Sequence, residues 1–458
     1  MIRWNTPSFT RLARRKGLSA TIVRAAAVLG ICCLGATEAD AASYWWNGPA
    51  ATSGTGSYTT LSNWLNAASG GAQPAVAPTS TDDVIFNVDS KNTTSVAMTM
   101  SAGNRDANSV VFKSTGSTLF VRSTSTNSAA NNFTLGTGGM TLSATSGSVT
   151  IGDLDRKVNF KAAASLAITN NSPSLLTFVQ TVEPASTASG AVVLTLTGTG
   201  TGGVQFNDVI GNNATTGTLG LVINTATAAV THLKAANTFT GGVTLTQGVL
   251  GVGSSTALGS NAVTINGGAI ASMTSSRTLA NDFTIGGDFT IGGQGQSIVL
   301  NGGMNLGGST RIITLGNSAT IGGLISNGGL AVTGSSGGNI RKLTLNGNNT
   351  YAAGTTISSG TLLAGSTTAF GSGAVTVALG ASLDLANLAI ANAITNNGGT
   401  ILNAGNYAGT QTLMSTASFS SLSAASTLSV GSGGKATLNG SIAGTLATLA
   451  GGTAELAA

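Results

Sequence analysis

Short apolar runs with a two-residue period recur along most of the chain, and corners of Gly, Ser and Asn separate them. Typical runs between positions 109 and 223 are SVVF, STLFV, NFTL, AVVLTLT and LGLVI. An apolar residue at every second position is the pattern of a half-buried strand, and branched side chains such as Val and Thr pack well on a pleated surface. The pattern therefore predicts an all-β fold built from short strands.

One stretch of this pattern occurs twice. NTFTGGVTLTQGVLGVGSSTALGSNAVTINGGA begins at Asn237 and NTYAAGTTISSGTLLAGSTTAFGSGAVTVALGA at Asn349, and the copies align without a gap at an offset of 112 (349 − 237). Similar residues replace one another, as Phe239 and Tyr351 do, and glycines fall where the chain must turn. Neither copy has the 3.6-residue period, length or caps of a helix. A repeat of this length predicts stacked structural units of about 20–25 residues per coil.

The repeat resembles the autotransporter-associated β-strand repeat, also called the passenger-associated transport repeat. The family pattern is N-T-[YF]-[ST]-G-G-T-T-[ILV]-x-x-G-x-L, then A-[LF]-G, a V-T-V strand and G-A-x-L, and residues 237–269 and 349–385 follow it. The exceptions are Ala353, where Gly is usual, and Leu379, where Gly or Asn is commoner. The resemblance covers about residues 108–385. It implies a right-handed parallel β-helix in a bacterial surface or secreted protein, and it implies no reaction.

The first 41 residues have the features of an export signal. A positive segment from Arg11 to Lys16 precedes an apolar run over 22–36, and Ala39-Asp40-Ala41 is a small-x-small cleavage site. The alternative is a membrane anchor, but the run is shorter than the ~18–20 apolar residues that a span needs. We therefore expect residues 1–41 to be a cleaved signal peptide and the mature chain to have no membrane span.

Residues 42–107 form a separate section before the β-helix of residues 108–458. This section contains Trp45, Trp46 and Trp64. An open end of a solenoid exposes apolar core and unpaired strand edges, so we expect an N-terminal cap with β structure and the tryptophans in its core. The alternative is a carbohydrate-binding module in which the tryptophan rings stack on sugars.

Removal of the predicted signal changes the charge balance. The chain has 19 Lys and Arg, 14 Asp and Glu, and a net charge of +5. The signal carries six of the basic and two of the acidic residues, which leaves 13 and 12, a net of +1 (13 − 12). No basic patch supports nucleic-acid binding. Both cysteines, Cys32 and Cys33, lie in the signal, which excludes disulfides and thiolate metal sites from the mature chain.

Few residue patterns suggest chemistry. Gly198, Gly200 and Gly203 match G-x-G-x-x-G, but another apparent strand follows, where a nucleotide site needs a helix N-terminus. His232 is the single histidine, so no site with several histidines can bind a metal. We expect it to be a partly exposed strand residue, although a Ser-His-Asp triad would have to use it.

Asp153 and Asp155, followed by Arg156 and Lys157, form the densest charged cluster of the mature chain. Their i, i+2 spacing on an expected strand would direct both carboxylates to the same side, as polysaccharide-cleaving β-helices require of acidic pairs. The alternative is a charged corner or loop that interrupts the coil, and the adjacent cations favour it because they hold both carboxylates ionised.

We therefore predict a secreted or bacterial cell-surface structural β-helix, acting as a stalk or an adhesin-like passenger. We expect no catalytic, cofactor-binding or metal-binding residues and no nucleic-acid partner, whereas a surface or matrix glycan or protein could be a partner. The alternative is a glycan-binding or polysaccharide-degrading β-helix, which would show a ladder of acidic or aromatic residues along one face. No such ladder is evident from the sequence.

Overall fold

The computed structural model describes residues 42–46, 55–67, 71–86, 96–100, 103–116, 118–122, 131–155, 157–293, 295–336 and 339–404, and the strands between 410 and 456. The export signal predicted for residues 1–41 and the side chain of Arg156 lie outside this part of the chain.

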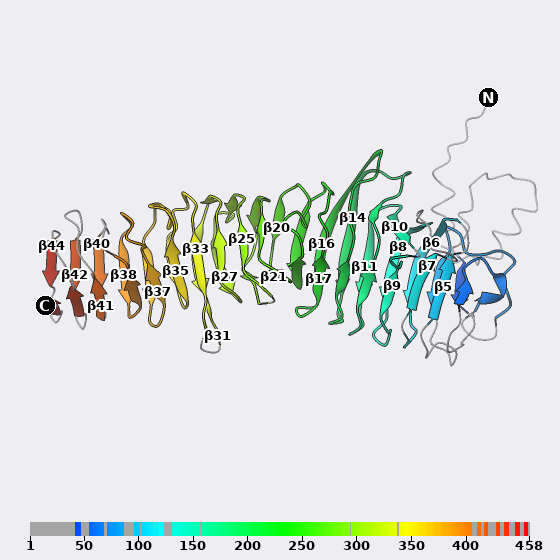
Figure 1. The fold of residues 1–458 in the computed structure, drawn as a ribbon, viewed down its shortest axis with the longest axis horizontal. Helices are drawn as coiled ribbons and strands as arrows, with labels where there is room; N and C mark the ends of the chain where they lie inside the picture. Colours follow the sequence, from blue (N-terminus) through cyan, green and yellow to red (C-terminus); the bar gives the residue numbers. More distant parts are fainter. Residues whose placement is uncertain are drawn as a thin grey trace, which may run out of the picture. The chain divides into compact units, whose positions relative to one another are not determined.

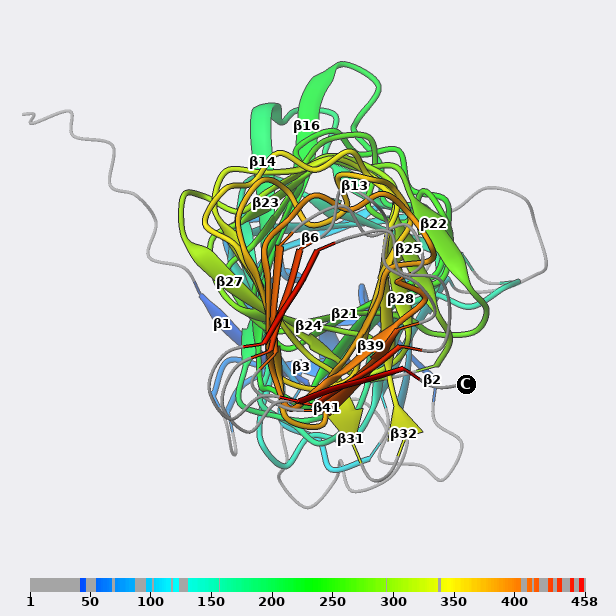
Figure 2. The ribbon, with the colours of Figure 1, turned by 90° about the vertical axis from the view of Figure 1, so that its left-hand side faces the viewer.

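The described chain is a stack of short strands, almost all paired in parallel with the strand one coil before and one coil after. Within residues 42–456, the strands follow one another along the long axis of Figure 1, and the view along that axis in Figure 2 shows them superposed on the sides of one outline. Parallel pairing between successive coils defines a β-solenoid, which confirms the predicted all-β parallel β-helix.

The first sheet, in stacking order, consists of β3 (Trp64–Leu65), β1 (Ser43–Trp46), β4 (Asp83–Phe86), β6 (Arg105–Phe112), β8 (Asn131–Leu142), β11 (Leu166–Asn170), β14 (Ser189–Gly198), β16 (Thr216–Thr225), β18 (Val243–Gln247), β20 (Val263–Ile265), β23 (Phe283–Ile285), β26 (Met304–Asn305) and β29 (Ile325–Ser326), with β10 (Val158–Ala162) and β13 (Val182–Pro184) branching from β8.

The second sheet, in stacking order, consists of β2 (Thr55–Ser57), β5 (Val96–Met100), β7 (Thr118–Arg122), β9 (Val149–Ile151), β12 (Leu176–Phe178), β15 (Val204–Phe206), β17 (Val230–Leu233), β19 (Val249–Val252), β21 (Ala269–Ser272), β24 (Phe289–Ile291), β27 (Thr310–Leu315), β30 (Gly329–Thr333), β34 (Thr355–Ile357), β36 (Val375–Ala378), β38 (Ile394–Asn397), β40 (Thr410–Leu413), β42 (Thr427–Val430) and β44 (Thr445–Thr448).

The third sheet consists of β22 (Arg277–Leu279), β25 (Ile298–Leu300), β28 (Ala319–Ile321), β33 (Lys342–Leu345), β35 (Thr361–Ala364), β37 (Ser382–Asp384) and β39 (Thr400–Leu402). The remaining elements are a short sheet of β41 (Thr416–Phe419), β43 (Lys435–Leu438) and β45 (Thr453–Leu456), a hairpin of β31 (Ser335–Ser336) and β32 (Asn339–Ile340), and a 3-10 turn, η1 (Leu61–Asn63).

Coil length changes along the stack. On the second sheet, Thr118 pairs with Val149 at an offset of 31 (149 − 118), and Ile394 pairs with Gln411 at an offset of 17 (411 − 394). The expectation of about 20–25 residues per coil was therefore too narrow at both ends. Long coils carry their extra residues in corners and in long strands such as β14 and β16, whose ends project from the stack in Figure 1.

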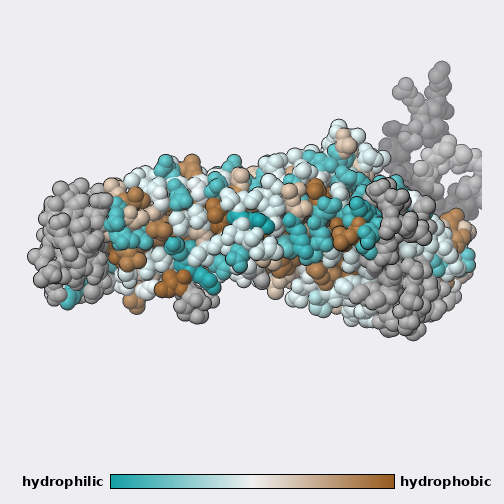
Figure 3. Space-filling model, viewed as in Figure 1, coloured by the Kyte–Doolittle hydropathy of each residue, from teal (hydrophilic) through white to brown (hydrophobic). Residues whose placement is uncertain are grey.

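Inward-facing apolar side chains of successive coils stack directly on one another. Phe178 pairs in register with Phe206, and their rings stack with centroids 5.0 Å apart. Such columns follow from register, because parallel in-register strands place equivalent residues one strand spacing apart. The outer surface seen in Figure 3 instead mixes hydrophilic and hydrophobic residues.

The two repeat copies also share a pair of side-chain hydrogen bonds, which the sequence alone does not reveal. Asn237 Oδ1 accepts from the Ile210 amide at 2.8 Å, and its Nδ2 donates to the Ala257 carbonyl at 2.6 Å. Asn349 does the same with Ile325 at 2.7 Å and Ala369 at 2.6 Å. Each buried Asn thus joins three successive coils at one corner.

A second feature shared by the copies is a glycine that faces the preceding coil. Gly259 and Gly371 have φ values of +67° and +63°. A Cβ at either would lie 2.2 or 2.1 Å from the carbonyl oxygen of Phe239 or Tyr351. Both the backbone conformation and the close approach require glycine at this position.

The N-terminal section begins the first sheet. Trp46 and Trp64 pair across antiparallel β1 and β3, and both are buried, with ring centroids 5.0 Å apart. Trp64 Nε1 donates to the Tyr58 carbonyl at 2.7 Å. The prediction of core tryptophans is confirmed for these two and wrong for Trp45, which alternates with buried neighbours and is only partly covered.

Candidate functional site

A row of polar side chains crosses four neighbouring strands of the first sheet. Asp106 on β6 pairs with Thr134 on β8, Thr134 with Lys161 on β10, and Lys161 with Glu183 on β13. Thr134, Lys161 and Glu183 each lie between buried neighbours, and Asp106 pairs in register with Thr134 and precedes buried Ala107, so these four residues face outward. Register therefore gathers residues that are 28 (134 − 106), 27 (161 − 134) and 22 (183 − 161) positions apart in the sequence.

A second polar row runs beside the first. Asn104, Asn132 and Asn159 occupy successive coils, two residues before the charged row. The backbone amide of Asn132 donates to Asn104 Oδ1 at 2.9 Å, and Asn159 Nδ2 donates to Asn132 Oδ1 at 3.4 Å. This side-chain ladder fixes the amides along one edge of the row.

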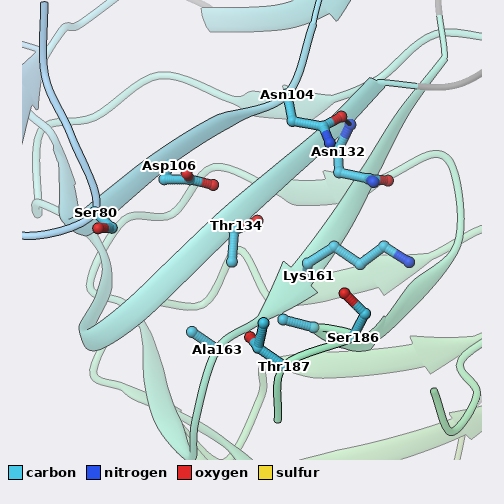
Figure 4. Close-up of a pocket in the computed structure, with 10 residues that line it drawn as sticks. Ser80, Asn104, Asp106, Asn132, Thr134, Lys161, Ala163, Ser186 and Thr187 are labelled. Atoms are coloured by element: carbon cyan, nitrogen blue, oxygen red, sulfur yellow. Dashed lines mark hydrogen bonds between the residues drawn. The ribbon is translucent and has the colours of Figure 1, made fainter. Parts of the chain in front are cut away.

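The two rows form the floor of a groove of about 360 Å³. Its lining is mostly hydroxyl, amide and charged groups, from Ser80, Asn104, Asp106, Asn132, Thr134, Lys161, Ala163, Ala185, Ser186 and Thr187. Figure 4 shows Thr134 between Asp106 and Lys161, with Ser186 and Thr187 on the neighbouring corner. We call this site the polar groove.

Two charged side chains line the polar groove, and they differ in their partners. Lys161 Nζ forms an ion pair with Glu183 Oε1, with the two side chains 16% and 23% exposed. The carboxylate of Asp106 has no hydrogen-bond or ion-pair partner within the described part of the chain. A desolvated Lys–Glu pair holds its geometry, whereas the Asp106 carboxylate is free to accept from a ligand.

Beneath the groove, a buried tyrosine supports the strand that carries Asp106. The Tyr58 hydroxyl donates to the Asp106 carbonyl at 2.9 Å. Burial, with the nearby carboxylates of Asp106 and Asp82, raises the pKa of Tyr58. The hydroxyl therefore stays protonated and keeps this bond at any ordinary pH.

The arrangement suits hydrogen bonding better than acid–base chemistry. Glycoside hydrolysis uses two carboxyl groups, one of which must be able to donate a proton. Asp106 is the single carboxylate in the groove lining, and Glu183, at the other end of the row, is paired with Lys161.

The acidic pair predicted from sequence lies elsewhere. Asp153 and Asp155 are in the corner between β9 and β10, and their placement on a strand was wrong, because Gly152 turns the chain with φ +85°. The Asp155 amide donates to Asp153 Oδ1 at 3.3 Å, and Gln180 Nε2 donates to the Asp153 carbonyl at 3.1 Å. The alternative of a charged corner is confirmed.

His232 is a half-buried residue of β17, as expected, paired with Gln205 on one side and Gly251 on the other. Its Nε2 has no hydrogen-bond partner in the described part of the chain. Burial first, and the charge of Lys234 second, lower the pKa of His232.

The G-x-G-x-x-G match has a structural explanation. A Cβ at Gly198 would lie 2.1 Å from the Asn170 carbonyl oxygen, and one at Gly200 would lie 2.1 Å from that of Ser172. The strand β15 follows, as predicted, where a nucleotide site would need a helix. Because these glycines have no side chain, the corners of two successive coils can stack with their backbones in contact.

The polar groove was not predicted from the sequence, because each of its residues is of a type that is common in the surrounding sequence. The available signal was the spacing of 28 and 27 between Asp106, Thr134 and Lys161, which equals the local coil length. That length becomes known only from the pairing register.

No protein-family model matches the chain, and neither a curated protein nor a solved structure matches it significantly. None of the helices within the described ranges is long and apolar enough to cross a bilayer.

Proposed function

We propose that this chain is an exported scaffold of the autotransporter-associated repeat class, acting at the cell surface or after secretion as a stalk or adhesin-like passenger. The observation that carries the proposal is the repeated corner, in which Asn237 and Asn349 make the same contacts in the two repeat copies. A protein that repeats its coil-joining contacts through such a stack has the physical properties of a spacer.

Two further features support export. The first 41 residues have the order of charge, apolar run and small-x-small site that a secretion system recognises. The remaining chain has no cysteine and takes its stability from stacked backbone hydrogen bonds and an apolar core, which redox conditions outside the cell do not affect. We assign no catalytic step to it.

The proposal is tested by expressing the full chain in a Gram-negative host and determining the N-terminus of the protein in each cell fraction. We expect a chain that begins at Ala42, found outside the cytoplasm. A matched variant with Ala39→Leu and Ala41→Leu should accumulate uncleaved, because large residues block the cleavage site. Intact protein that stays in the cytoplasm, with wild type and variant alike, would refute export.

The glycan-binding alternative is favoured by one observation, the polar groove, whose floor is a row of hydrogen-bonding groups along the stack.

A further inference from the structure

We propose that the polar groove is a binding site for a neutral oligosaccharide. This inference does not rest on export or on a stalk role, because it depends only on the groups that line the groove.

The first argument is that several hydrogen-bonding side chains in the groove have no partner within the described chain. Within the described chain, the side-chain oxygens of Asp106, Thr134, Ser186 and Thr187 make no hydrogen bond with the protein, although all four line the groove. The side chains of Asn104 and Asn132 line the same groove. A cluster of both donors and acceptors matches a ligand with many hydroxyl groups, each of which donates and accepts.

The second argument is electrostatic. The two charged residues in the lining, Asp106 and Lys161, have opposite sign, and Lys161 is also paired with Glu183. The groove therefore has no excess of positive charge to attract an anionic ligand, unlike a site for polyuronates or phosphates.

The third argument excludes an extended peptide. Peptides that bind to sheets pair with a free strand edge or insert apolar side chains into pockets. At the groove, β8 and β10 are paired on both sides, and on the outer side of β6 the Tyr58 hydroxyl donates to the Asp106 carbonyl. The apolar lining is limited to Ala163 and Ala185.

The fourth argument is the direction of the row. Asp106, Thr134, Lys161 and Glu183 lie on consecutive strands, so three strand spacings of ~4.8 Å make the row about 14 Å long. A row that runs across the strands offers polar side chains at regular steps, which suits a linear chain of repeating units lying along the stack.

The test is titration calorimetry of the purified protein with maltohexaose, cellohexaose and mannohexaose, and with hexagalacturonate as the anionic comparison. We expect at least one neutral hexasaccharide to bind, and more tightly than hexagalacturonate. Thr134→Val keeps the shape of the side chain but removes its hydroxyl, and should weaken binding about three- to tenfold. Asp106→Ala should weaken the same binding and improve that of hexagalacturonate, because it removes the one negative charge of the groove that has no cation beside it.

The matched control is Thr264→Val, which removes a half-buried, outward-facing hydroxyl from β20 of the same sheet. It should leave binding unchanged, and thermal melts of all three variants should match wild type. The proposal is overturned if no neutral hexasaccharide binds at 10-mM concentrations, roughly the weakest affinity that such a site would need. Tighter binding of hexagalacturonate by the wild type, or equal losses in Thr134→Val and Thr264→Val, would also overturn it.

Discussion

The hydroxyl of Tyr351 lies 2.7 Å from Oγ1 of Thr355, and both side chains are buried in the core. Thr355 in turn donates to the Phe370 carbonyl at 3.3 Å. In the other repeat copy the equivalent residues are Phe239 and Val243, which have no hydroxyl to satisfy. The two copies thus fill equivalent core positions with an apolar pair in one copy and with a hydrogen-bonded pair in the other.

This relationship predicts strong coupling between the two positions. Thr355→Val alone should lower the free energy of unfolding by about 1–3 kcal/mol, because it leaves a buried tyrosine hydroxyl without a partner. The double variant Tyr351→Phe with Thr355→Val recreates the chemistry of Phe239 and Val243, and should recover most of that loss. Urea unfolding of the single and double variants measures the coupling. Additive losses would show that the hydrogen bond contributes nothing.

The corner asparagines predict a second effect on stability. Asn349→Ala should lower the free energy of unfolding by roughly 2–4 kcal/mol, because it leaves the buried Ile325 amide and Ala369 carbonyl unpaired. Asn397→Ala is the control, since Asn397 is exposed on β38, and its effect should stay within about 0.5 kcal/mol. Similar urea midpoints for the two variants would contradict the coil-joining role.

Two glycines allow the cost of a strained backbone to be measured separately from the cost of a steric clash. Gly380 has φ +79° and open space where a Cβ would lie, whereas Gly371 has φ +63° and a Cβ there would lie 2.1 Å from the Tyr351 carbonyl oxygen. Gly380→Ala should therefore cost only the ~1–2 kcal/mol of a left-handed residue. Gly371→Ala should cost clearly more, because the neighbouring coil must move. Thermal melts compare the two, and equal losses would argue against tight stacking at this corner.

The single histidine predicts a pH dependence of stability. Because folding lowers the pKa of His232, the unfolded chain binds the proton first as the pH falls. Its effect on stability is absent above the ordinary pKa of ~6.5 and becomes increasingly unfavourable as the pH falls through that value toward the lowered pKa. His232→Gln should remove this part of the loss between pH 7.5 and 5, as followed by urea midpoints. An identical pH profile for wild type and variant would exclude His232 as the cause.

The sequence predicted the positions of strands and turns well, but it did not predict which strands pair with one another. Alternation at Val243, Leu245 and Val249, broken at Gly248, correctly placed a turn between β18 and β19. The same reasoning placed Asp153 on a strand, because periodicity does not reveal that Gly152 turns the chain.

Candidate sites were harder to predict than strands, because a site depends on which coil lies beside which. Coil length varies along the stack, so no constant spacing links positions such as Asp106 and Glu183. The sequence alone identifies the buried phenylalanines of these strands as core residues, because they are large and apolar. It does not single out the outward-facing threonines and asparagines, because these residue types are common throughout the chain.

Parallel stacking also determines how the molecule responds to a pulling force. The hydrogen bonds between successive coils lie along the stack, so tension along that axis loads one layer of bonds at a time instead of shearing all of them together. The coil from Thr355 to Val375, an offset of 20 (375 − 355), would release about 70 Å of chain when it peels away. The solenoid would therefore lengthen in steps under load.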